Sequence, residues 1–154
     1  MKKLSLLLLV IAAATSSFAK TGDKDITKVK KITTNEVVTS LKIYKDVEVV
    51  LTDDSSNEIQ IVGEDTDVEK ISVKVTNGEL IISSASNGYF KNKLVVYVPS
   101  KNLADVYIHG SSTLSSSVTL PNDMLDITIN GEGKSIVSTA GKINMNTIRD
   151  FPQE

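Results

Sequence analysis

Short stretches in which apolar and polar residues alternate run through almost the whole chain after residue 35, and they constrain the fold more than any other feature. Two examples are "ISVKV" at 71–75 and "LDITI" at 125–129. Alternation with a period of two places the apolar side chains on one face of a β-strand. The stretches are rich in Val and Ile and are bounded by Gly, Asn, Asp, Ser or Pro, which is typical of strands. Helical periodicity is absent from this part of the sequence, which therefore predicts an all-β fold.

Two architectures accommodate many short strands, a sandwich of hairpins and a solenoid of stacked coils. Asn77-Gly78 favours a local hairpin, because a type I′ turn needs a positive φ at both residues. An approximate repeat favours the solenoid, since "LADVYIHG" and "LDITING" place Gly110 and Gly131 21 residues apart. A fixed period near 20 is typical of stacked coils. We predict one β-helix or β-solenoid-like domain over residues 35–154, with a local hairpin at Asn77-Gly78.

The N-terminus has the three parts of a secretory signal peptide. Two lysines follow Met1, an apolar run occupies residues 4–14, and small residues at Ser17 and Ala19 flank Phe18. A membrane-spanning helix needs about 20 apolar residues, and this run is shorter. We therefore predict an exported protein from which residues 1–19 are removed, followed by a flexible, lysine-rich lead-in over residues 20–34.

Composition narrows the possible functions further. The chain has no cysteine, which excludes disulfides, thiolate metal sites and a lipid-attachment cysteine. Removal of residues 1–19 takes Lys2 and Lys3 from the 17 basic side chains and none of the 19 acidic ones, leaving a net charge near −4. A nucleic-acid partner is disfavoured because such proteins rely on clustered cations. We predict no stable membrane insertion after cleavage.

Several stretches resemble one known family. They are "LKIYKDVEVVLTDDSSNEIQIVGEDTDVEKISVKVTNGELIIS", "KLVVYVPSKNLADVYIHGSSTLSS" and "LDITINGEGKSI". Together they resemble the GIN-domain (DUF2807) family of secreted bacterial proteins, named after the head domain of an autotransporter adhesin. The resemblance runs from about Leu41 to Ile136. It implies a β-helix-like solenoid, an exported location and no established enzymatic activity, and it supplies no catalytic residues or cofactor.

Two acidic stretches are the candidates for a metal site. The first, "TDDSSNE" at 52–58, offers oxygen ligands suited to Ca²⁺ on Asp53, Asp54, Asn57 and Glu58. It lacks the spacing of a known calcium loop, so we expect solvated turn residues. The second stretch, "GEDTDVE" at 63–69, leads to the same expectation, and we predict no metal or other cofactor.

A catalytic role has little support. His109 is the only histidine, and its counterpart in the second copy of the repeat is Asn130. Asn and His adopt the left-handed conformation more often than most residues, so we expect both, with the following Gly110 and Gly131, to be turn residues. One enzymatic alternative stays open. Asp105 and Asp126 precede equivalent strands and would stack one coil apart, as acids do in polysaccharide-cleaving enzymes.

Aromatic side chains are the candidates for a binding surface. Alternation with valine and isoleucine places Tyr97 and Tyr107 on the outward side of their strands. The longest break in the pattern, "SASNGYFKNK" at 84–93, contains Tyr89 and Phe90. We predict that these four residues, with Tyr44 as a further candidate, contact a glycan or a protein at the cell envelope. Alternatives are a periplasmic scaffold or sensor component, and self-association through unpaired strand edges at the ends of a solenoid.

Overall fold

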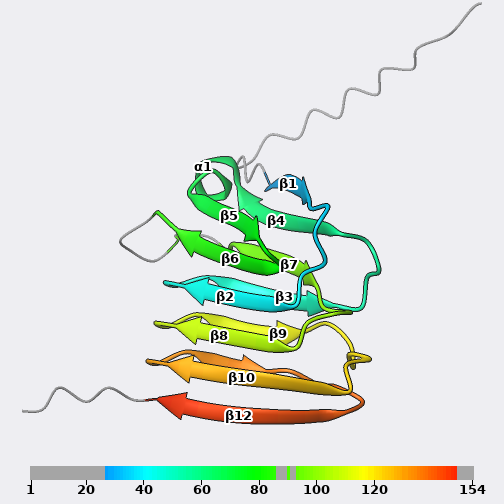
Figure 1. The fold of residues 1–154 in the computed structure, drawn as a ribbon. Helices are drawn as coiled ribbons and strands as arrows, with labels where there is room; N and C mark the ends of the chain where they lie inside the picture. The colour runs from blue at the N-terminus through cyan, green and yellow to red at the C-terminus, as the bar shows by residue number, and fades with distance from the viewer. Residues whose placement is uncertain (1–26, 86–89, 91–92, 149–154) are drawn as a thin grey trace, which may run out of the picture.

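A computed structural model describes residues 27–85, 90 and 93–148 and contains two six-stranded β-sheets (Figure 1). In spatial order the first sheet consists of β1 (Thr27–Thr33), β4 (Glu58–Glu64), β7 (Val95–Pro99), β3 (Glu48–Thr52), β9 (Thr113–Ser116) and β11 (Lys134–Ile136). The second consists of β12 (Lys142–Ile148), β10 (Met124–Asn130), β8 (Asp105–His109), β2 (Ser40–Tyr44), β6 (Glu79–Ser84) and β5 (Ile71–Thr76). The all-β prediction is confirmed.

From β6 to β12 successive strands alternate between the two sheets, and equivalent strands pair in parallel. The second sheet places β2, β8, β10 and β12 side by side, while the first places β3, β9 and β11 side by side. This pairing explains the approximate repeat, because β8 and β10 align in register, with Val106 opposite Ile127 and His109 opposite Asn130. The two similar stretches are therefore neighbours in space.

Three strand pairs, all at the end of the two sheets that contains β1 and β5, are antiparallel instead. Antiparallel pairs join β1 to β4, β4 to β7 and β5 to β6, so both sheets are mixed rather than purely parallel. The turn between β5 and β6 is formed by Asn77 and Gly78, which have φ values of 54° and 76°. Both values are positive, as a type I′ turn requires.

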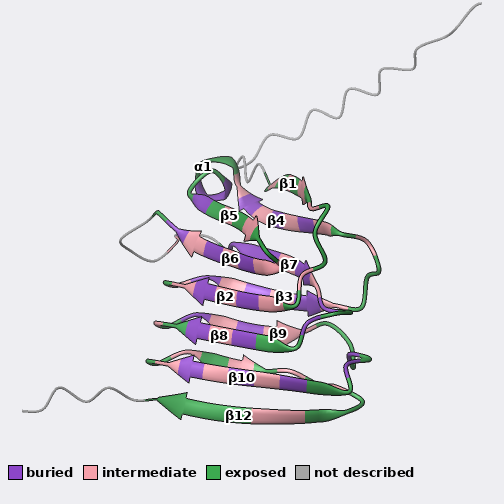
Figure 2. Cartoon of the chain, in the orientation of Figure 1, coloured by how far each residue is buried: buried purple, intermediate pink, exposed green. Residues whose placement is uncertain are grey.

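The core lies between the sheets and is built from the inward-facing residues of each strand. In the second sheet, Leu41, Val106 and Ile127 form one buried row across β2, β8 and β10. In the first sheet, Val49 and Leu114 are buried in the same way on β3 and β9. Each fully buried side chain of this kind contributes about 1.5–3 kcal/mol. Figure 2 shows the buried segments along these strands and the largely exposed β12.

The predicted flexible lead-in is wrong for residues 27–33, which form β1 and pair along their whole length with β4. Low apolar content suggested disorder, but lysines of this strand are paired with acids that are distant in sequence. Lys28 and Lys30 contact Glu69, and Lys31 Nζ lies 2.9 Å from Glu58 Oε1. Residues 1–19 and the first part of the lead-in lie outside the described residues.

A single helical turn, α1 (Asp65–Val68), connects β4 in the first sheet to β5 in the second. The sequence showed no helical periodicity here because four residues are too few to produce one. Val68 is completely buried and belongs to the core. No helix among the described residues is long and apolar enough to cross a membrane.

The glycine turns after β8 and β10 stack on each other. Gly110 and Gly131 have φ values of 89° and 112°, and Gly110 N donates to the carbonyl oxygen of Asn130 at 3.0 Å. A Cβ atom on Gly131 would lie 3.1 Å from the carbonyl oxygen of Gly110. The expected left-handed conformation of His109 and Asn130 is wrong, since each is the last residue of a strand and the positive φ falls on the following glycine.

Buried polar side chains hold the chain where it passes from one sheet to the other. Asn122 Nδ2 donates to the carbonyl oxygens of Ser100 and Leu103 at 2.8 and 2.7 Å. Ser112 Oγ donates to the carbonyl oxygen of Lys45 and accepts a bond from Val47 N. These side chains satisfy backbone groups that no strand pairs, which is required when such groups are buried.

Candidate functional site

The outer face of the second sheet carries a cluster of aromatic and polar side chains. Alternate residues of its strands point away from the core, and parallel pairing in register aligns them from strand to strand. We call this surface the tyrosine face. Its outward members on the four central strands and β12 are Ser40, Lys42, Tyr44, Glu79, Ile81, Ser83, Asp105, Tyr107, His109, Met124, Asp126, Thr128, Asn130, Lys142, Asn144, Asn146 and Ile148.

Three aromatic rings meet at the centre of this face. The ring centroid of Tyr44 lies 6.4 Å from that of Tyr107 and 5.9 Å from that of His109. Tyr107 and His109 are stacked, with centroids 6.4 Å apart and an interplanar angle of 13°. Asn130 Nδ2 donates to the Tyr107 hydroxyl at 3.1 Å. The rings therefore restrain one another, which lowers the entropic cost of ordering them around a ligand.

Charges on the tyrosine face are unevenly compensated. Lys42 Nζ lies 2.7 Å from Glu79 Oε2, and this hydrogen bond raises the pKa of Lys42. Asp105 and Asp126 lie directly opposite each other on β8 and β10, and Asn144 Nδ2 donates to Asp126 Oδ1 at 2.6 Å. No cation of the described residues forms an ion pair with Asp105 or Asp126. Outside the Lys42–Glu79 pair the face carries two acids, Asp105 and Asp126, and one cation, Lys142, so its net charge is weakly negative.

The aromatic residues predicted from sequence do not form one surface. Tyr97 points outward, as expected, but from β7 in the first sheet, where it lies beside Val50 and Gln60. It therefore faces away from Tyr107. Phe90 is half-buried and packs against the core, so its ring is not displayed as predicted. Tyr89 lies outside the described residues.

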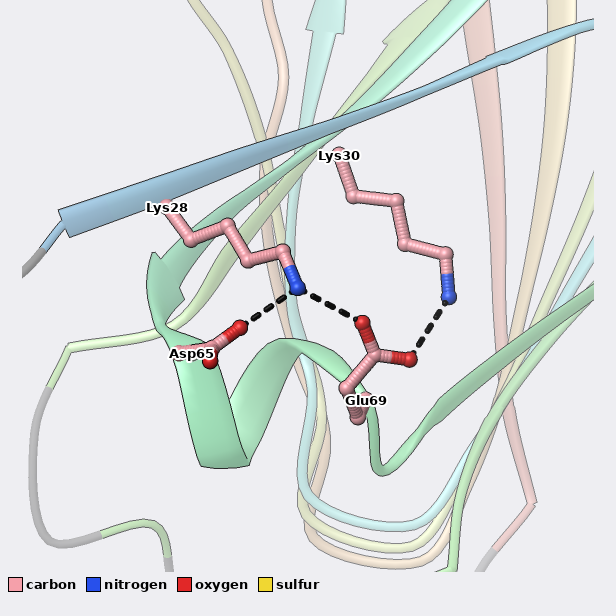
Figure 3. Close-up of polar contacts among 4 residues, drawn as sticks. All are labelled: Lys28, Lys30, Asp65 and Glu69. Atoms are coloured by element: carbon pink, nitrogen blue, oxygen red, sulfur yellow. Dashed lines mark hydrogen bonds and ion pairs between the residues drawn. The ribbon is translucent and has the colours of Figure 1, made fainter.

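Side chains of both acidic stretches form hydrogen bonds or ion pairs within the protein. Asp54 accepts hydrogen bonds from Ser56 N at 2.8 Å and Ser56 Oγ at 2.9 Å, which lower the pKa of Asp54. In the second stretch, Asp65 and Glu69 contact Lys28 (Figure 3). Over residues 27–85, 90 and 93–148, no three side chains of the His, Cys, Asp or Glu types gather in a way that could hold a metal ion.

His109 is a member of the aromatic cluster for which the sequence predicts only a turn role, based on the tolerance of His and Asn for the left-handed conformation. The alternation that identified Tyr107 as outward also predicts an outward side chain two residues later, at His109. The structure places His109 at the exposed end of β8, against both tyrosines.

Solved structures with a similar fold come from bacterial adhesin-like proteins. An adhesin-type protein of Parabacteroides merdae ("putative adhesin") shares 19% identity with a TM-score of 0.55, over 79% of this chain and 55% of the other. A "putative adhesin" of Parabacteroides distasonis shares 13% identity with a TM-score of 0.55, over 82% of this chain and 68% of the other. At these identities the similarity establishes the fold alone. The chain spans little more than half the length of the P. merdae protein.

Sequence comparison identifies the family. No curated protein matches the chain significantly. The family model described as "Putative auto-transporter adhesin, head GIN domain" matches residues 38–148, which include all the strands from β2 to β12. This range contains the whole tyrosine face and leaves out β1. The chain therefore belongs to the GIN-domain (DUF2807) family, as the resemblance of its sequence predicted.

Proposed function

We propose that the protein is an exported, non-enzymatic binding module of adhesion type, and that the tyrosine face is its contact surface. The observation that carries this proposal is the cluster of Tyr44, Tyr107 and His109 on aligned strands of one sheet. Aromatic residues with polar tips are enriched where proteins recognise ligands and partners. The adhesin name of the family supports a binding role.

The ligand we propose is a glycan. Tyrosine and histidine rings offer flat surfaces on which the apolar side of a sugar ring can stack, and the hydroxyl and amide groups around them can pair with sugar hydroxyls. Thr128 and Asn130 supply such groups next to the cluster. A protein partner at the cell envelope, including one that would use the domain as a scaffold or sensor, is the alternative that the experiments below distinguish.

Rigid display is the mechanism that follows from this arrangement. The strand pairs β2–β3, β8–β9 and β10–β11 stack as coils of a short solenoid-like unit, and each coil holds its outward side chains in register with the next. A fixed array of side chains binds with a smaller entropic cost than a flexible loop. The fold would thus act as a scaffold for the tyrosine face.

The decisive experiment compares two outward tyrosines on opposite faces. We expect Tyr107→Ala to abolish binding on a glycan array or to weaken it about tenfold or more, since stacking and a hydrogen bond are both lost. Tyr97→Ala is the matched control and should bind normally, with both variants keeping the wild-type melting temperature. Loss of binding in Tyr97→Ala alone would move the site to the first sheet. Absence of glycan binding, with capture of a specific envelope protein, would favour the protein partner.

Export and location need a separate measurement. We propose that residues 1–19 direct export and that the domain functions in the periplasm, at the outer-membrane surface or outside the cell. Protease treatment of intact cells, with a periplasmic protein as the lysis control, distinguishes these locations. Digestion on whole cells supports adhesion, whereas protection until the outer membrane is opened favours the scaffold or sensor role.

A polysaccharide-acting enzyme is the second candidate, because Asp105 and Asp126 lie directly opposite each other on adjacent strands. Catalysis by two carboxylates requires them to flank the scissile bond. Turnover of any polysaccharide that disappears in both Asp105→Asn and Asp126→Asn would establish this activity. We expect no turnover over a broad panel.

Self-association is proposed at the C-terminal end of the stack. Within the described residues, no strand pairs with the outer edge of β12, and Met145, although in an inward-facing row, is 55% exposed. Unpaired edges with exposed apolar residues favour pairing with another chain. We expect light scattering to detect dimers at high concentration and Met145→Asp to prevent them. A monomeric mass at all concentrations would contradict the proposal.

A further inference from the structure

The tyrosine face is organised in straight rows that cross the strands. The central row runs from Lys42 through Tyr107 and Thr128 to Asn146, and a second row runs from Tyr44 through His109 to Asn130. Neighbouring members of a row are separated by the distance between strands, about 4.8 Å. From Tyr107 toward β12 the central row carries only uncharged polar side chains, whereas along β8 the outward residues change from an acid to aromatic rings. A ligand laid across the strands in that direction therefore meets no charged side chain in the row, unlike a ligand laid along β8.

The two directions away from the aromatic cluster differ in chemistry. Toward β12 the central row continues with Thr128 and Asn146, which are uncharged and can both donate and accept hydrogen bonds. Toward β5 it continues with Ile81 and Lys74, beyond the Lys42–Glu79 ion pair. Sugar hydroxyls can therefore find uncharged hydrogen-bonding partners along the central row only in the direction of β12.

The charge beside this path determines which glycans fit. Asp105 and Asp126 lie two residues along their strands from Tyr107 and Thr128, a separation of about 7 Å. This is within the screening length of about 8 Å at physiological ionic strength. Neither carboxylate has a cationic partner among the described residues. A uronic acid or sulfate group on the ligand would therefore be repelled.

We infer that the tyrosine face binds a neutral glycan chain laid across the strands. One sugar stacks on the cluster of Tyr44, Tyr107 and His109, and the following sugars extend toward β12 over Thr128 and Asn146. This inference rests on the proposed glycan-binding function and adds the direction and charge class of the ligand.

The test begins with an array of neutral, uronic-acid and sulfated glycans and continues with calorimetry on the strongest neutral binder, at chain lengths of two, four and six sugars. We expect only neutral glycans to bind, and the dissociation constant to fall about tenfold or more from two sugars to four. Thr128→Ala and Asn146→Ala should each weaken binding of the longer chains about two- to tenfold, the effect of one lost hydrogen bond. Asn146→Ala should leave binding of the disaccharide within about twofold, since one sugar of the disaccharide occupies the aromatic cluster and the other lies over Thr128.

Lys74→Ala is the matched control, because it lies in the central row on the other side of the cluster. It should leave all three dissociation constants unchanged. Weakening by Lys74→Ala but not by Asn146→Ala, preference for anionic glycans, or affinity independent of chain length would overturn the inference while leaving glycan binding intact. Absence of any glycan binding would overturn both the inference and the proposed ligand. Asn146 is exposed on β12, so its replacement does not threaten folding.

Discussion

The core between the two sheets is covered at its N-terminal end and exposed at its C-terminal end, although both ends are built from strands with the same alternating pattern. At the N-terminal end, α1 passes from one sheet to the other and its last residue, Val68, is completely buried. At the C-terminal end, Met145 occupies an inward-facing row behind Ile127 and is still 55% exposed. The difference shows that alternation determines which way a side chain points, and that only a neighbouring element on each side buries it.

Ion pairs also hold together the elements at the covered, N-terminal end. Lys28 Nζ lies 2.8 Å from Glu69 Oε1 and also contacts Asp65, while Lys30 Nζ lies 3.3 Å from Glu69 Oε2 (Figure 3). These contacts join β1 to α1 and raise the pKa of Lys28 while lowering that of Glu69. The equivalent region around β12 has no ion pair among the described residues.

The largest expected effect comes from placing the same charge at both ends. Val68→Asp should lower the free energy of unfolding by about 4 kcal/mol, because the new carboxylate is buried without a partner. Met145→Asp should cost less than about 1 kcal/mol, since the carboxylate stays in contact with water. Urea unfolding followed by circular dichroism measures both. Equal losses would contradict the difference between the ends.

An intermediate effect is expected at the turn of Gly131, which stacks on the turn of Gly110. Gly131→Ala should lower the free energy of unfolding by about 1–3 kcal/mol, because φ is 112° and the added methyl group would crowd the backbone of Gly110. The neighbouring Glu132→Ala is the control and should be nearly neutral. Thermal unfolding of both variants checks this. A neutral Gly131→Ala would mean that the turn can relax without the left-handed conformation.

The smallest effect concerns the contacts between β1 and α1. Because folding lowers the pKa of Glu69 below its ordinary value of 4.5, its stabilising contribution is present above pH 4.5 and is lost as the pH falls through the lowered value. Hydrogen exchange should therefore show weaker protection of β1 amides at pH 3 than at pH 7. Glu69→Gln should reduce protection at pH 7 and abolish this part of the pH dependence, whereas Glu132→Gln should change neither. If the protection of β1 depends on pH in the same way in wild type and in Glu69→Gln, the Glu69 contacts do not stabilise β1.

Sequence reasoning succeeded where the determinant was local. Alternation identified the strands and the outward direction of Tyr97 and Tyr107, and the spacing of Gly110 and Gly131 reported stacked turns. It failed for β1, whose order depends on contacts with Glu69 and Asp65, and for Phe90, which packs against the core. In both cases the missing information lay in residues distant in sequence.

The alternating pattern by itself determined that this chain forms β-strands with one buried and one outward side, since a strand repeats every two residues. Only the tertiary structure decided which strands share a sheet. That choice brought Tyr44 of β2 next to Tyr107 and His109 of β8, and placed Tyr97 on the opposite side of the molecule. Strand pairing between distant segments depends on the packing of the whole core, and no local pattern encodes it.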